Sequence, residues 1–597
     1  MSELSKASDL IAEFLKAKEI KLAFGVIGSA NAYIFDSIHT LGYTEIITTH
    51  HEQSAVMAAG AVFRASGRLS VALVTAGAGA SNAVTGVISN WADSIPCLVL
   101  AGQEGTHHLE IDAERRMFGT QGYDAAKMML DVTKLSRCVL DPCSLQDALE
   151  DAYEMSLTPR YGPVWLDIPF DVQAARVQPR EWRALADNKP MPVLSAVRQI
   201  IAAIRESKRP VILGGHGVRL AGAQANFKEF TSNLNVPVSL SWSAIDLLAS
   251  SDENFVGRWG LYGQRAANFI VQSADLVLVF GSRLAIPQVG YDFNQFARGA
   301  KVIVVDIEPC KHPVHLQVFG DCKLVLETLE HMDMTQWMDS DGWWSHCSAM
   351  KQSYPLVSEE HEDEGSYVNS YKFIGELSKR LDDDHIVVTD MGTALLSGHQ
   401  SIHLKAGQTM FTSLGLGEMG YGLPGAIGAA FACPSRNVLC LNNDGGIMMN
   451  LQELHTIVEH KLKVKVVIFN NDGYLMIKHT QKMLFKGNYV QVDKKTGVGL
   501  PDFSKLMPAF GYEYFKLHSW ETDTDIIAEF LAHPSASALE VFMHPEQAFI
   551  PKVKGVALED GKIAPAPLED MSPLLGIRAL EEGMLVPLSD TSKAAKR

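Results

Sequence analysis

Short apolar runs alternate with stretches of helical periodicity along most of the chain, and the runs fall into three groups. Each run is followed by a polar or glycine-rich turn. Strands that alternate with helices are typical of βαβ units, so the pattern predicts α/β domains built on parallel sheets. The predicted strands are residues 21–27, 70–74, 97–101 and 164–168 in the first group, 210–215, 276–281 and 302–306 in the second, and 386–389, 438–442 and 464–470 in the third.

Two polar stretches separate the groups. Residues 178–192 are polar and contain proline, and residues 333–364 are rich in Met, Trp, Ser and acidic side chains, which is typical of linkers. After about residue 555 the pattern decays into a segment rich in proline and charge. The predicted organisation is an N-terminal domain over residues 1–180, a central domain over 190–345, a third domain over 365–555 and a tail over 556–597.

Composition narrows the class of protein. The 597 residues are 47% hydrophobic and 20% charged, which is ordinary for a globular enzyme. With 52 basic and 69 acidic residues the net charge is −17, which argues against non-specific binding to nucleic acid or to an anionic membrane. The eight cysteines form no CxxC pair, so neither a disulfide scaffold nor a structural zinc site is expected.

No apolar stretch is long enough to span a membrane, and residues 1–16 are typical of a polar amphipathic helix and not of a signal peptide. The expectation is a large, acidic, cytoplasmic enzyme.

The most informative motif is a pair of turns in the third group. Asn443-Asp444-Gly445-Gly446 precedes Asn470-Asn471-Asp472-Gly473, each turn follows an apolar run, and a helix is predicted between them over 449–460. Asp444 and Asn471 would then lie at the carboxyl ends of two parallel strands, where open α/β sheets bind ligands. A carboxylate and an amide oxygen suit Mg²⁺, and glycine amides can approach a diphosphate. Two ordinary βα turns explain the same residues equally well.

The spacing of these turns resembles the thiamine-diphosphate (ThDP) motif, in which Gly-Asp-Gly is followed after a similar interval by Asn-Asn. Residues 450–454 and 463–471 look like the same region of acetohydroxyacid synthases, and Asn443 replaces the motif's first glycine. The resemblance implies specific roles. The implied Mg²⁺ ligands are Asp444, Asn471 and the carbonyl of Gly473, and the implied cofactor contacts nearby are Gly445, Gly446, Tyr474 and Met476.

An acidic residue of the first group completes the resemblance. Glu52 stands between a predicted strand and the small-residue helix Gln53–Ala65, in a His-Glu-Gln sequence similar to that of the family. The resemblance implies that Glu52 hydrogen-bonds N1′ of the aminopyrimidine, so that the 4′-nitrogen can deprotonate the thiazolium C2. A glutamate favoured by a helix dipole is the alternative. Gln121 matches a family active-site glutamine, and Ala78 replaces the proline of a Gly-Pro-Gly loop.

Two further segments of the third group are similar to family loops. In the stretch 415–425, Met419 stands where the family's methionine supports the bent cofactor, and Gly417 lies beside it. Asp390-Met391-Gly392-Thr393-Ala394 aligns with the diphosphate loop, with Thr393 and Ala394 in place of Gln-His. The resemblance therefore adds Met391, Gly392 and Thr393 to the implied cofactor contacts.

The resemblance covers about residues 5–555 and implies three doubly wound α/β domains. It also implies that the cofactor lies between the first domain of one chain and the third of another, hence a homodimer or homotetramer. In the central domain, Gly215, Arg283 and Asp306 occupy FAD-contact regions of the family. FAD is one alternative there, and a domain kept without flavin, as in several relatives, is the other.

The implied chemistry is decarboxylation of a 2-oxo acid, commonly pyruvate, and transfer of the acyl-anion unit. Acetohydroxyacid synthases hold a second 2-oxo acid with an Arg and a Trp, and the aligned positions here are Pro287 and Thr480. Neither side chain can bind a carboxylate in a bidentate manner, although Lys478 or His479 could substitute.

The prediction is therefore a carboligase with an aldehyde or ketone acceptor, a keto-sugar among them. Acetolactate synthase proper, a 2-oxo acid decarboxylase or oxidase, and a non-catalytic regulatory subunit are the alternatives. Residues 481–500 suit either a lid over the site or a plain surface loop.

Overall fold

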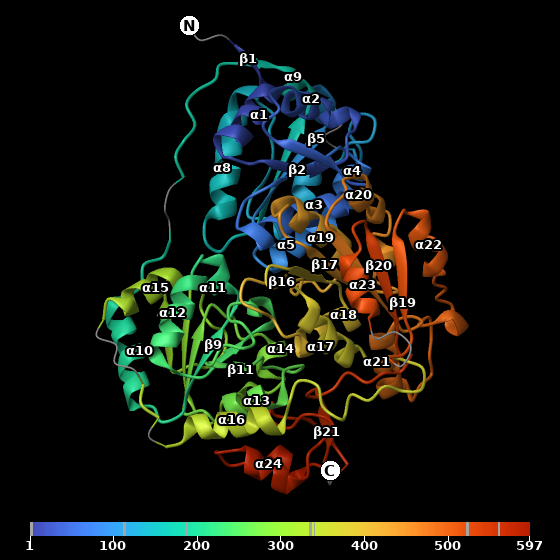
Figure 1. Ribbon diagram of the computed structural model, residues 1–597. Coiled ribbons are helices and arrows are strands. Elements are labelled where there is room, and N and C mark those ends of the chain that lie inside the picture. Colours follow the sequence, from blue (N-terminus) through green and yellow to red (C-terminus); the bar gives the residue numbers. More distant parts are fainter. Residues whose placement is uncertain are drawn as a thin grey trace. The chain divides into compact units, whose positions relative to one another are not determined.

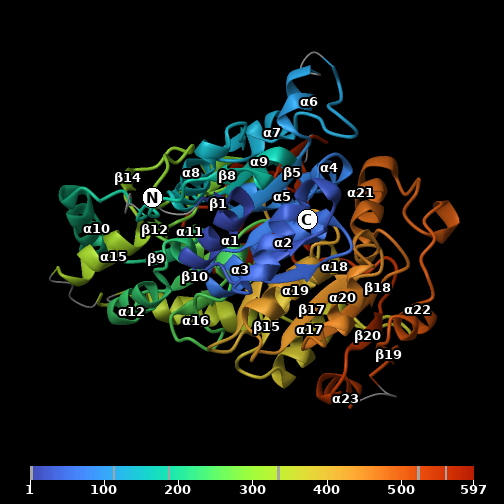
Figure 2. The same cartoon turned by 90° about the horizontal axis from the view of Figure 1, so that it is seen from above.

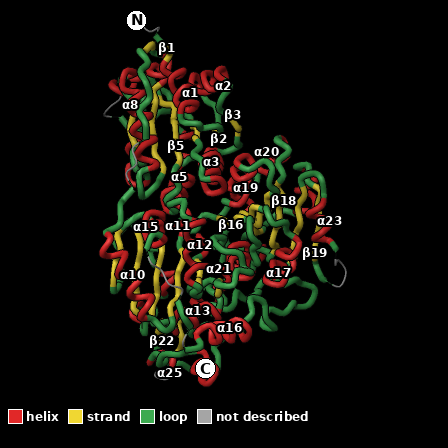
Figure 3. The backbone as a smooth tube through the Cα atoms, turned by 60° about the vertical axis from the view of Figure 1, so that its left-hand side comes forward, coloured by secondary structure: helices red, strands yellow, loops and turns green. Residues whose placement is uncertain are grey.

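Three six-stranded sheets, in which every neighbouring pair of strands is parallel, form the framework of the protein. The computed structural model describes residues 4–111, 115–185, 189–332, 337–339, 341–520, 525–558 and 561–596. Helices flank the strands of each sheet (Figures 1 and 3). The predicted α/β class with three parallel-sheet domains is confirmed, because apolar strands buried on both faces need helices on both sides.

The N-terminal sheet places the strand before Glu52 near one edge. Across the sheet the strands are β3 (Glu45–Thr48), β2 (Leu22–Gly25), β4 (Val71–Val74), β5 (Cys97–Gln103), β7 (Pro163–Pro169) and β6 (Ser136–Cys138). Its principal helices are α1 (Ala7–Ala17), α2 (Ala32–Leu41), α3 (Glu52–Ser66), α4 (Ala78–Asn82), α5 (Val84–Ala92) and α8 (Leu145–Leu157). Helix α1 corresponds to the helix expected over residues 1–16, whose first three residues lie outside the described residues.

The C-terminal sheet repeats the same order of strands. Its strands are β16 (Thr409–Phe411), β15 (Ile386–Thr389), β17 (Val438–Asn443), β18 (Val464–Asn470), β20 (Ser537–Phe542) and β19 (Glu513–Leu517), and β17, β18, β20 and β19 follow one another in Figure 2. Its helices include α18 (Thr393–Ser401), α19 (Gly422–Ala432), α20 (Glu453–Glu459), α21 (Leu475–Phe485), α22 (Phe503–Ala509) and α23 (Ile526–Ala532). In both sheets the order reverses between the first and third strands along the chain, which marks the expected ligand crevice.

The central sheet has a different order. Its strands are β11 (Phe255–Gly257), β10 (Val238–Leu240), β9 (Pro210–Gly214), β12 (Leu276–Phe280), β13 (Lys301–Asp306) and β14 (Leu316–Phe319). Helices around it include α10 (Leu194–Glu206), α12 (Gln224–Leu234), α13 (Arg265–Ser273), α14 (Ile286–Val289), α15 (Cys322–Glu330) and α16 (Trp343–Ser353). This is the order 3-2-1-4-5-6 of dinucleotide-binding folds, with the switch point between β9 and β12.

The chain divides into two compact units. The first unit consists of Met1–Asn188, Asp384–Leu395 and Thr409–Pro545, so it contains the N-terminal and C-terminal sheets. The second unit consists of Lys189–Asp383, Leu396–Gln408 and Glu546–Arg597, so it contains the central sheet.

Helices α3 and α19 join the two sheets of the first unit. A Cβ placed on Gly428 of α19 would lie 2.2 Å from the carbonyl oxygen of Ala58 in α3, so only glycine permits this approach. Residues 55–62 of α3 are almost all Ala, Gly, Val or Met and are buried. The small-residue helix predicted over 53–65 is therefore confirmed, and its composition reflects helix-to-helix packing within the first unit.

The segment after residue 555 folds onto the second unit. It contains the antiparallel strands β21 (Gly555–Ala557) and β22 (Ile563–Pro565) and helices α24 (Ile577–Gly583) and α25 (Asp590–Ala594). Asn268 of α13 donates to the carbonyl of Leu568 at 2.9 Å, and Gln272 donates to the buried carboxylate of Glu569 at 2.7 Å. In the described part of the chain, no helix is both long enough and apolar enough to cross a membrane.

Candidate active site

The two predicted metal-ligand turns meet at the carboxyl end of the C-terminal sheet. Asp444 follows β17 and Asn471 follows β18, and these strands are neighbours in register. The Oδ2 of Asp444 accepts hydrogen bonds from the backbone N–H of Asn471 at 2.9 Å and of Gly473 at 3.0 Å. The structure thus brings all three implied ligands together, as the spacing along two parallel strands requires.

The donor set fits a hard divalent cation. Asp444 is fully buried, and burial raises the pKa of its carboxyl to about 7 despite three backbone N–H donors. Asn471 is also buried, and among the described residues its Oδ1 has no hydrogen-bond partner. A buried amide oxygen without a donor is costly, and a cation beside it and the carboxylate would remove both penalties. These residues therefore fit Mg²⁺.

The backbone conformation at position 473 requires glycine. Its φ of +132° is unfavourable for other residues, and a Cβ there would lie 2.0 Å from the carbonyl oxygen of Val492. The chain segment around Val492 therefore lies directly against the turn that supplies the third ligand. A second contact holds it there, because the N–H of Tyr474 donates to the same Val492 carbonyl at 2.8 Å.

The implied diphosphate contacts lie at the switch point of this sheet. Met391 and Gly392 follow β15, Gly445 and Gly446 follow β17, and helix α18 begins at Thr393. A Cβ on Gly446 would lie 2.2 Å from Oδ2 of Asp390, so the two turns are in contact. A helix N-terminus and glycine amides at a switch point form an anion-binding arrangement.

Asn443 explains how the chain tolerates its departure from the family's Gly-Asp-Gly. Its Nδ2 donates to the carbonyl of Met391, and its Oδ1 accepts from the N–H of Ala394 at 3.0 Å. The side chain therefore links the turn over 443–446, which carries Asp444, to the start of α18. From the sequence we could see only that Asn443 replaces the motif's first glycine. Its side-chain amide, which can both donate and accept a hydrogen bond, was the one hint that it links the two turns.

Glu52 is the first residue of α3 and is only 7% exposed. Its Oε2 accepts a hydrogen bond from Nδ2 of Asn82 at 3.0 Å, and the Nδ1 of His51 caps the helix by accepting from the N–H of Gln53. The carboxyl group also lies beside Gly79, where a Cβ would be 3.2 Å from Oε1. The Asn82 amide and the close approach of α4 therefore fix where this carboxyl group lies.

Gln121 lies against the short segment that leads into Ala78. The side chain of Gln121 donates to the carbonyl of Ala76 at 3.4 Å, and Ala78 begins α4 two residues later. Glu104 fixes this arrangement because its carboxylate accepts from the N–H of Gln121 at 3.0 Å. Sequence reasoning did not single out Glu104.

The start of the segment that carries Met419 is held by the N-terminal domain. The Asp93 carboxylate accepts from the N–H groups of Leu414 and Gly415 at 2.9 and 2.7 Å, and it pairs with the buried guanidinium of Arg64 at 2.8 Å. Met419 itself stays 37% exposed, and Gly417 lies against the sulfur of Met391. The N-terminal domain thus anchors the loop of the C-terminal domain that carries Met419, a role that neither Asp93 nor Arg64 revealed in the sequence.

Comparison with known proteins decides the family. A family model described as "Thiamine pyrophosphate enzyme, N-terminal TPP binding domain" matches residues 5–128, the corresponding central-domain model matches 197–329, and the C-terminal TPP-binding model matches 390–541. The large subunit of acetolactate synthase isozyme 1 from Escherichia coli K12 is 31% identical over 92% of this chain and 95% of its own length. A probable acetolactate synthase large subunit from Methanococcus aeolicus is 30% identical over 89% and 91%.

The chain belongs to the acetolactate-synthase-like thiamine-diphosphate enzymes. It is therefore a ThDP-dependent enzyme of the kind that forms carbon–carbon bonds. The central matched region contains the whole central sheet, whereas the N-terminal region ends before β6 and β7 and the C-terminal region begins after β15.

Acetohydroxyacid synthases bind the second 2-oxo acid at positions that correspond to Pro287 and Thr480 in this ThDP enzyme. Thr480 is exposed, and its hydroxyl donates to the carbonyl of Met476 at 3.1 Å. Lys478 is buried, and its ammonium group lies 3.4 Å from the carboxylate of Asp493. Pro287 belongs to the second unit, in α14. The Lys478 charge therefore already has a carboxylate partner within the chain.

The segment over 481–500 is ordered by its own hydrogen bonds. Helix α21 continues to Phe485, and the Gln481 amide exchanges two hydrogen bonds with the backbone of Val490, at 3.0 and 2.9 Å. Asp493 and Thr496 cap a short 3-10 turn. The segment is therefore ordered and lies against the turn at Gly473. That it moves as a lid stays a prediction.

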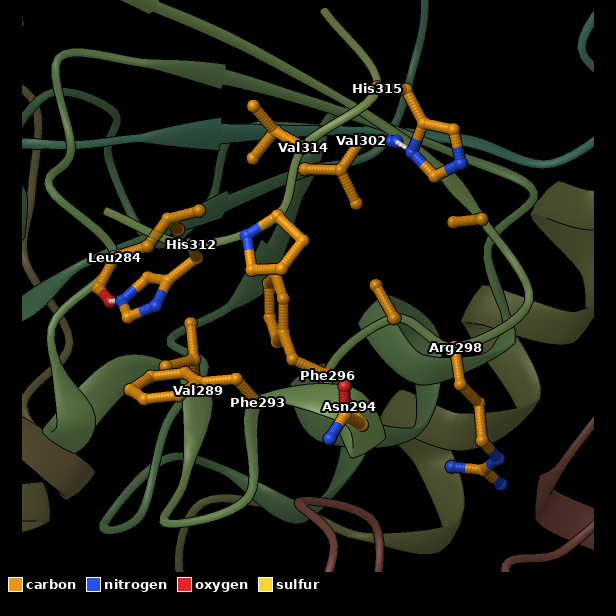
Figure 4. Close-up of a pocket in the computed structure, with 13 residues that line it drawn as sticks. Leu284, Val289, Phe293, Asn294, Phe296, Arg298, Val302, His312, Val314 and His315 are labelled. Carbon is orange, nitrogen blue, oxygen red and sulfur yellow. Dashed lines mark hydrogen bonds between the residues drawn. The ribbon is translucent and has the colours of Figure 1, made fainter. Parts of the chain in front are cut away.

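The implied flavin contacts of this ThDP enzyme lie around the switch point of the central sheet. Gly215 follows β9, Arg283 follows β12 and is exposed, and Asp306 ends β13. A separate cavity of the second unit is lined mainly by apolar side chains, with His312 stacked on Phe293 and bonded to the carbonyl of Leu284 (Figure 4). None of its lining residues is an implied cofactor contact.

Proposed function

We propose that this ThDP enzyme decarboxylates a 2-oxo acid, pyruvate in the first place, and transfers the acyl unit to an aldehyde or ketone. The observation that carries the proposal is the buried group of Asp444, Asn471 and Gly473 beside the glycine turn at the switch point. The Asp444 carboxylate, the free Oδ1 of Asn471 and the Gly473 carbonyl would hold Mg²⁺. The turn 445–446 and the start of α18 would hold the diphosphate.

Side chains of the protein would bind and orient the cofactor and the substrate. When bound, ThDP supplies the carbon nucleophile and the electron sink for decarboxylation. Glu52 would share a proton with N1′ of the aminopyrimidine and so favour the imino tautomer, whose 4′-nitrogen is the base. Met419 would pack against the cofactor, and Gln121 would lie beside the substrate. Tyr474 and Met476 complete the pocket at the start of α21.

The acceptor is inferred from the groups that could bind it. A second 2-oxo acid needs a cation for its carboxylate, but Lys478 is paired with Asp493 and Thr480 is uncharged. A neutral carbonyl compound, such as an aldehyde, a ketone or a keto-sugar, needs no such cation. Acetolactate synthesis is the second candidate, and the names of the relatives favour it. Simple decarboxylation or oxidation of the two-carbon unit is a third.

Assembly and flavin complete the proposal. The active unit is a homodimer or homotetramer, with the cofactor between the N-terminal domain of one chain and the C-terminal domain of another. The strand order of the central sheet supports a bound dinucleotide at Gly215, Arg283 and Asp306. A flavin-free central domain is the alternative, and the visible absorbance of the purified protein distinguishes the two.

The direct test replaces one carboxylate. Wild-type protein should consume pyruvate only with ThDP and Mg²⁺ present, and Glu52→Gln should lose most turnover, at least about 100-fold, while its circular dichroism and ThDP binding persist. Full turnover by Glu52→Gln would refute the role of Glu52. Wild-type protein that neither binds ThDP in calorimetry nor consumes pyruvate would favour a regulatory subunit.

A further inference from the structure

The loop over residues 413–421 carries Met419 between β16 and α19. It belongs to the C-terminal domain, and a Cβ on Gly417 would lie 3.7 Å from the sulfur of Met391 in the diphosphate loop. Met419 would therefore contact the cofactor whose diphosphate this same domain binds, whichever chain supplies Glu52 to it. The position of Met419 depends on how this loop is held.

The end of the loop is held inside its own domain. Oδ1 of Asp390 accepts hydrogen bonds from the N–H groups of Gly420 and Tyr421, at 2.8 and 3.2 Å. Asp390 is fully buried and directly precedes Met391. The residues that follow Met419 are therefore tied to the diphosphate loop itself.

The start of the loop is held instead by the C-terminal end of α5, in the N-terminal domain. The Asp93 carboxylate accepts from the N–H groups of Leu414 and Gly415. A Cβ on Gly415 would lie 2.7 Å from Oδ1 of Asp93, so the carboxylate and the loop backbone are in close contact. The Ser89 hydroxyl donates to the hydroxyl of Ser413 at 3.0 Å. One end of the loop thus depends on each domain.

Arg64 of α3 lies at the centre of these contacts. Its side chain is only 4% exposed, and its guanidinium pairs with Asp93 at 2.8 Å. The guanidinium carbon also lies 5.6 Å from the ring centre of Tyr421, and the charge of Glu418, the residue before Met419, acts on it. Burial alone would lower the pKa of Arg64, but these three neighbours raise it above its usual value, so the guanidinium stays charged.

Glu418 depends on the same cation. Burial raises the pKa of its carboxyl, and Arg64 opposes that rise together with the hydroxyls of Ser89 and Ser413. Its Oε2 accepts from Ser413 at 2.8 Å, whereas its Oε1 is buried and has no hydrogen-bond partner among the described residues. Loss of the Arg64 charge would therefore leave a buried, uncompensated carboxylate directly beside Met419.

We propose that Arg64 is a positioning residue that holds Met419 against the cofactor. Its guanidinium fixes Asp93, which holds the start of the loop, and balances the charge of Glu418. Arg64 touches no reacting atom and acts through Met419, so the inference rests on the role proposed for Met419. The competing explanation is a buried ion pair whose loss only destabilises the fold.

Variants of the ion pair and one matched control separate the two explanations. Arg64→Met removes the guanidinium. Combining it with Asp93→Asn removes both charges of the pair, which avoids an uncompensated partner if the single variant fails to fold. The control is Arg265, which is 5% exposed, as Arg64 is 6%, and donates to the carbonyls of Met571 and Pro573 at 3.1 and 2.9 Å in the second unit. Arg265→Met thus reports the loss of a buried arginine as such.

The experiment measures how fast the C2 proton of protein-bound ThDP exchanges with D₂O, by rapid quench and NMR, on the full-length protein with saturating ThDP and Mg²⁺. Thermal unfolding and the affinity for inorganic pyrophosphate with Mg²⁺ are measured alongside, because pyrophosphate would bind the metal and diphosphate turns without Met419. Arg64→Met and the double variant should slow exchange about tenfold or more, because small displacements of groups around a reacting centre have large effects on rate. Pyrophosphate affinity should stay within about threefold of wild type, because the groups that bind it lie outside the loop. Arg265→Met should exchange at the wild-type rate.

Two results would overturn the proposal. One is wild-type exchange in both Arg64→Met and the double variant. The other is slowed exchange that Arg265→Met reproduces at a similar loss of thermal stability, or that a proportionate loss of pyrophosphate affinity accompanies. Glu52→Gln serves as the reference, because unchanged exchange in that variant would refute the proposed function itself, whereas slowed exchange only in Glu52→Gln would refute the role of Arg64 alone.

Discussion

Asn471 donates its backbone N–H to Oδ2 of Asp444 at 2.9 Å, while its own side-chain oxygen, buried beside that carboxylate, has no hydrogen-bond partner among the described residues. The backbone therefore places the side chain, and the oxygen is left available for a cation. Asn470, one residue earlier, uses its side chain differently and donates to Glu540.

This pair of asparagines gives a matched test of the metal site. Asn471→Ala should weaken Mg²⁺-dependent ThDP binding by at least about tenfold, because it removes a ligand. Asn470→Ala should leave binding within about threefold of wild type, because its side chain is committed to Glu540. Isothermal titration calorimetry in the presence and absence of Mg²⁺ gives the measurement. Equal losses in the two variants would contradict the assigned ligand.

Asn443 should resist replacement by the glycine that the family motif has at this position. Asn443→Gly removes the hydrogen bonds to Met391 and Ala394 and leaves a buried N–H without a partner, at a cost of about 1–3 kcal/mol. The expected result is a lower midpoint of thermal unfolding together with weaker ThDP binding. A variant that binds ThDP more tightly than wild type would show that the amide is only tolerated.

The ion pair of Lys478 with Asp493 should hold the segment over 490–496 and not the substrate. Lys478→Met should make this segment more susceptible to limited proteolysis, because it leaves the carboxylate of Asp493 without its buried partner. KM for pyruvate should stay within about twofold, because the ammonium group is already committed to Asp493. Asp493→Asn should reproduce both effects. A large rise in KM in Lys478→Met alone would show that the ammonium group binds a substrate carboxylate.

Buried Asp167 should make stability depend on pH in the N-terminal domain. Burial raises the pKa of this carboxyl to about 6, although Trp165, Ala126 and Gln103 donate to it. The folded protein then retains a proton that the unfolded chain releases near pH 4, so stability falls as pH rises from about 4 to about 6.

Asp167→Asn should remove that dependence. Relative to wild type, the variant should gain roughly 2.5 kcal/mol between pH 4 and pH 7, measured as the change in the difference of unfolding free energies without cofactor. The difference between two pH values cancels any fixed cost of the substitution. A constant difference across this range would show that folding does not raise the pKa of Asp167.

Sequence reasoning located the elements that local pattern determines. Apolar runs such as 438–442 and 464–470 correspond to strands because a buried parallel strand is apolar on both faces. The helix expected over 449–460 begins only at Glu453, because residues 447–449 form a 3-10 turn that places Asn450. Pattern reasoning could not foresee this turn, since its geometry depends on contacts with Ser54 and Gly420.

The two turns that carry Asp444 and Asn471 could be predicted, because each directly follows an apolar strand and their spacing can be read along the sequence. The residues that support the site could not be, because their partners are distant in sequence. Asp93 contacts Leu414 and Gly415, and Ser54 contacts Asn450, because the packing of α3 against α19 brings these distant parts of the chain together. Nothing near Asp93 in the sequence distinguishes it from a surface aspartate.

The central claim is that the acyl unit of a 2-oxo acid is transferred to a neutral carbonyl acceptor, and product analysis with labelled pyruvate tests it most directly. Purified protein with ThDP and Mg²⁺ is given carbon-13-labelled pyruvate alone, with 2-oxobutyrate, and with a panel of aldehydes, ketones and keto-sugars. The account predicts a labelled two-carbon unit bonded to a member of the panel, formed faster than any product of two 2-oxo acids. Labelled acetaldehyde or acetate as the sole product under every condition would contradict it.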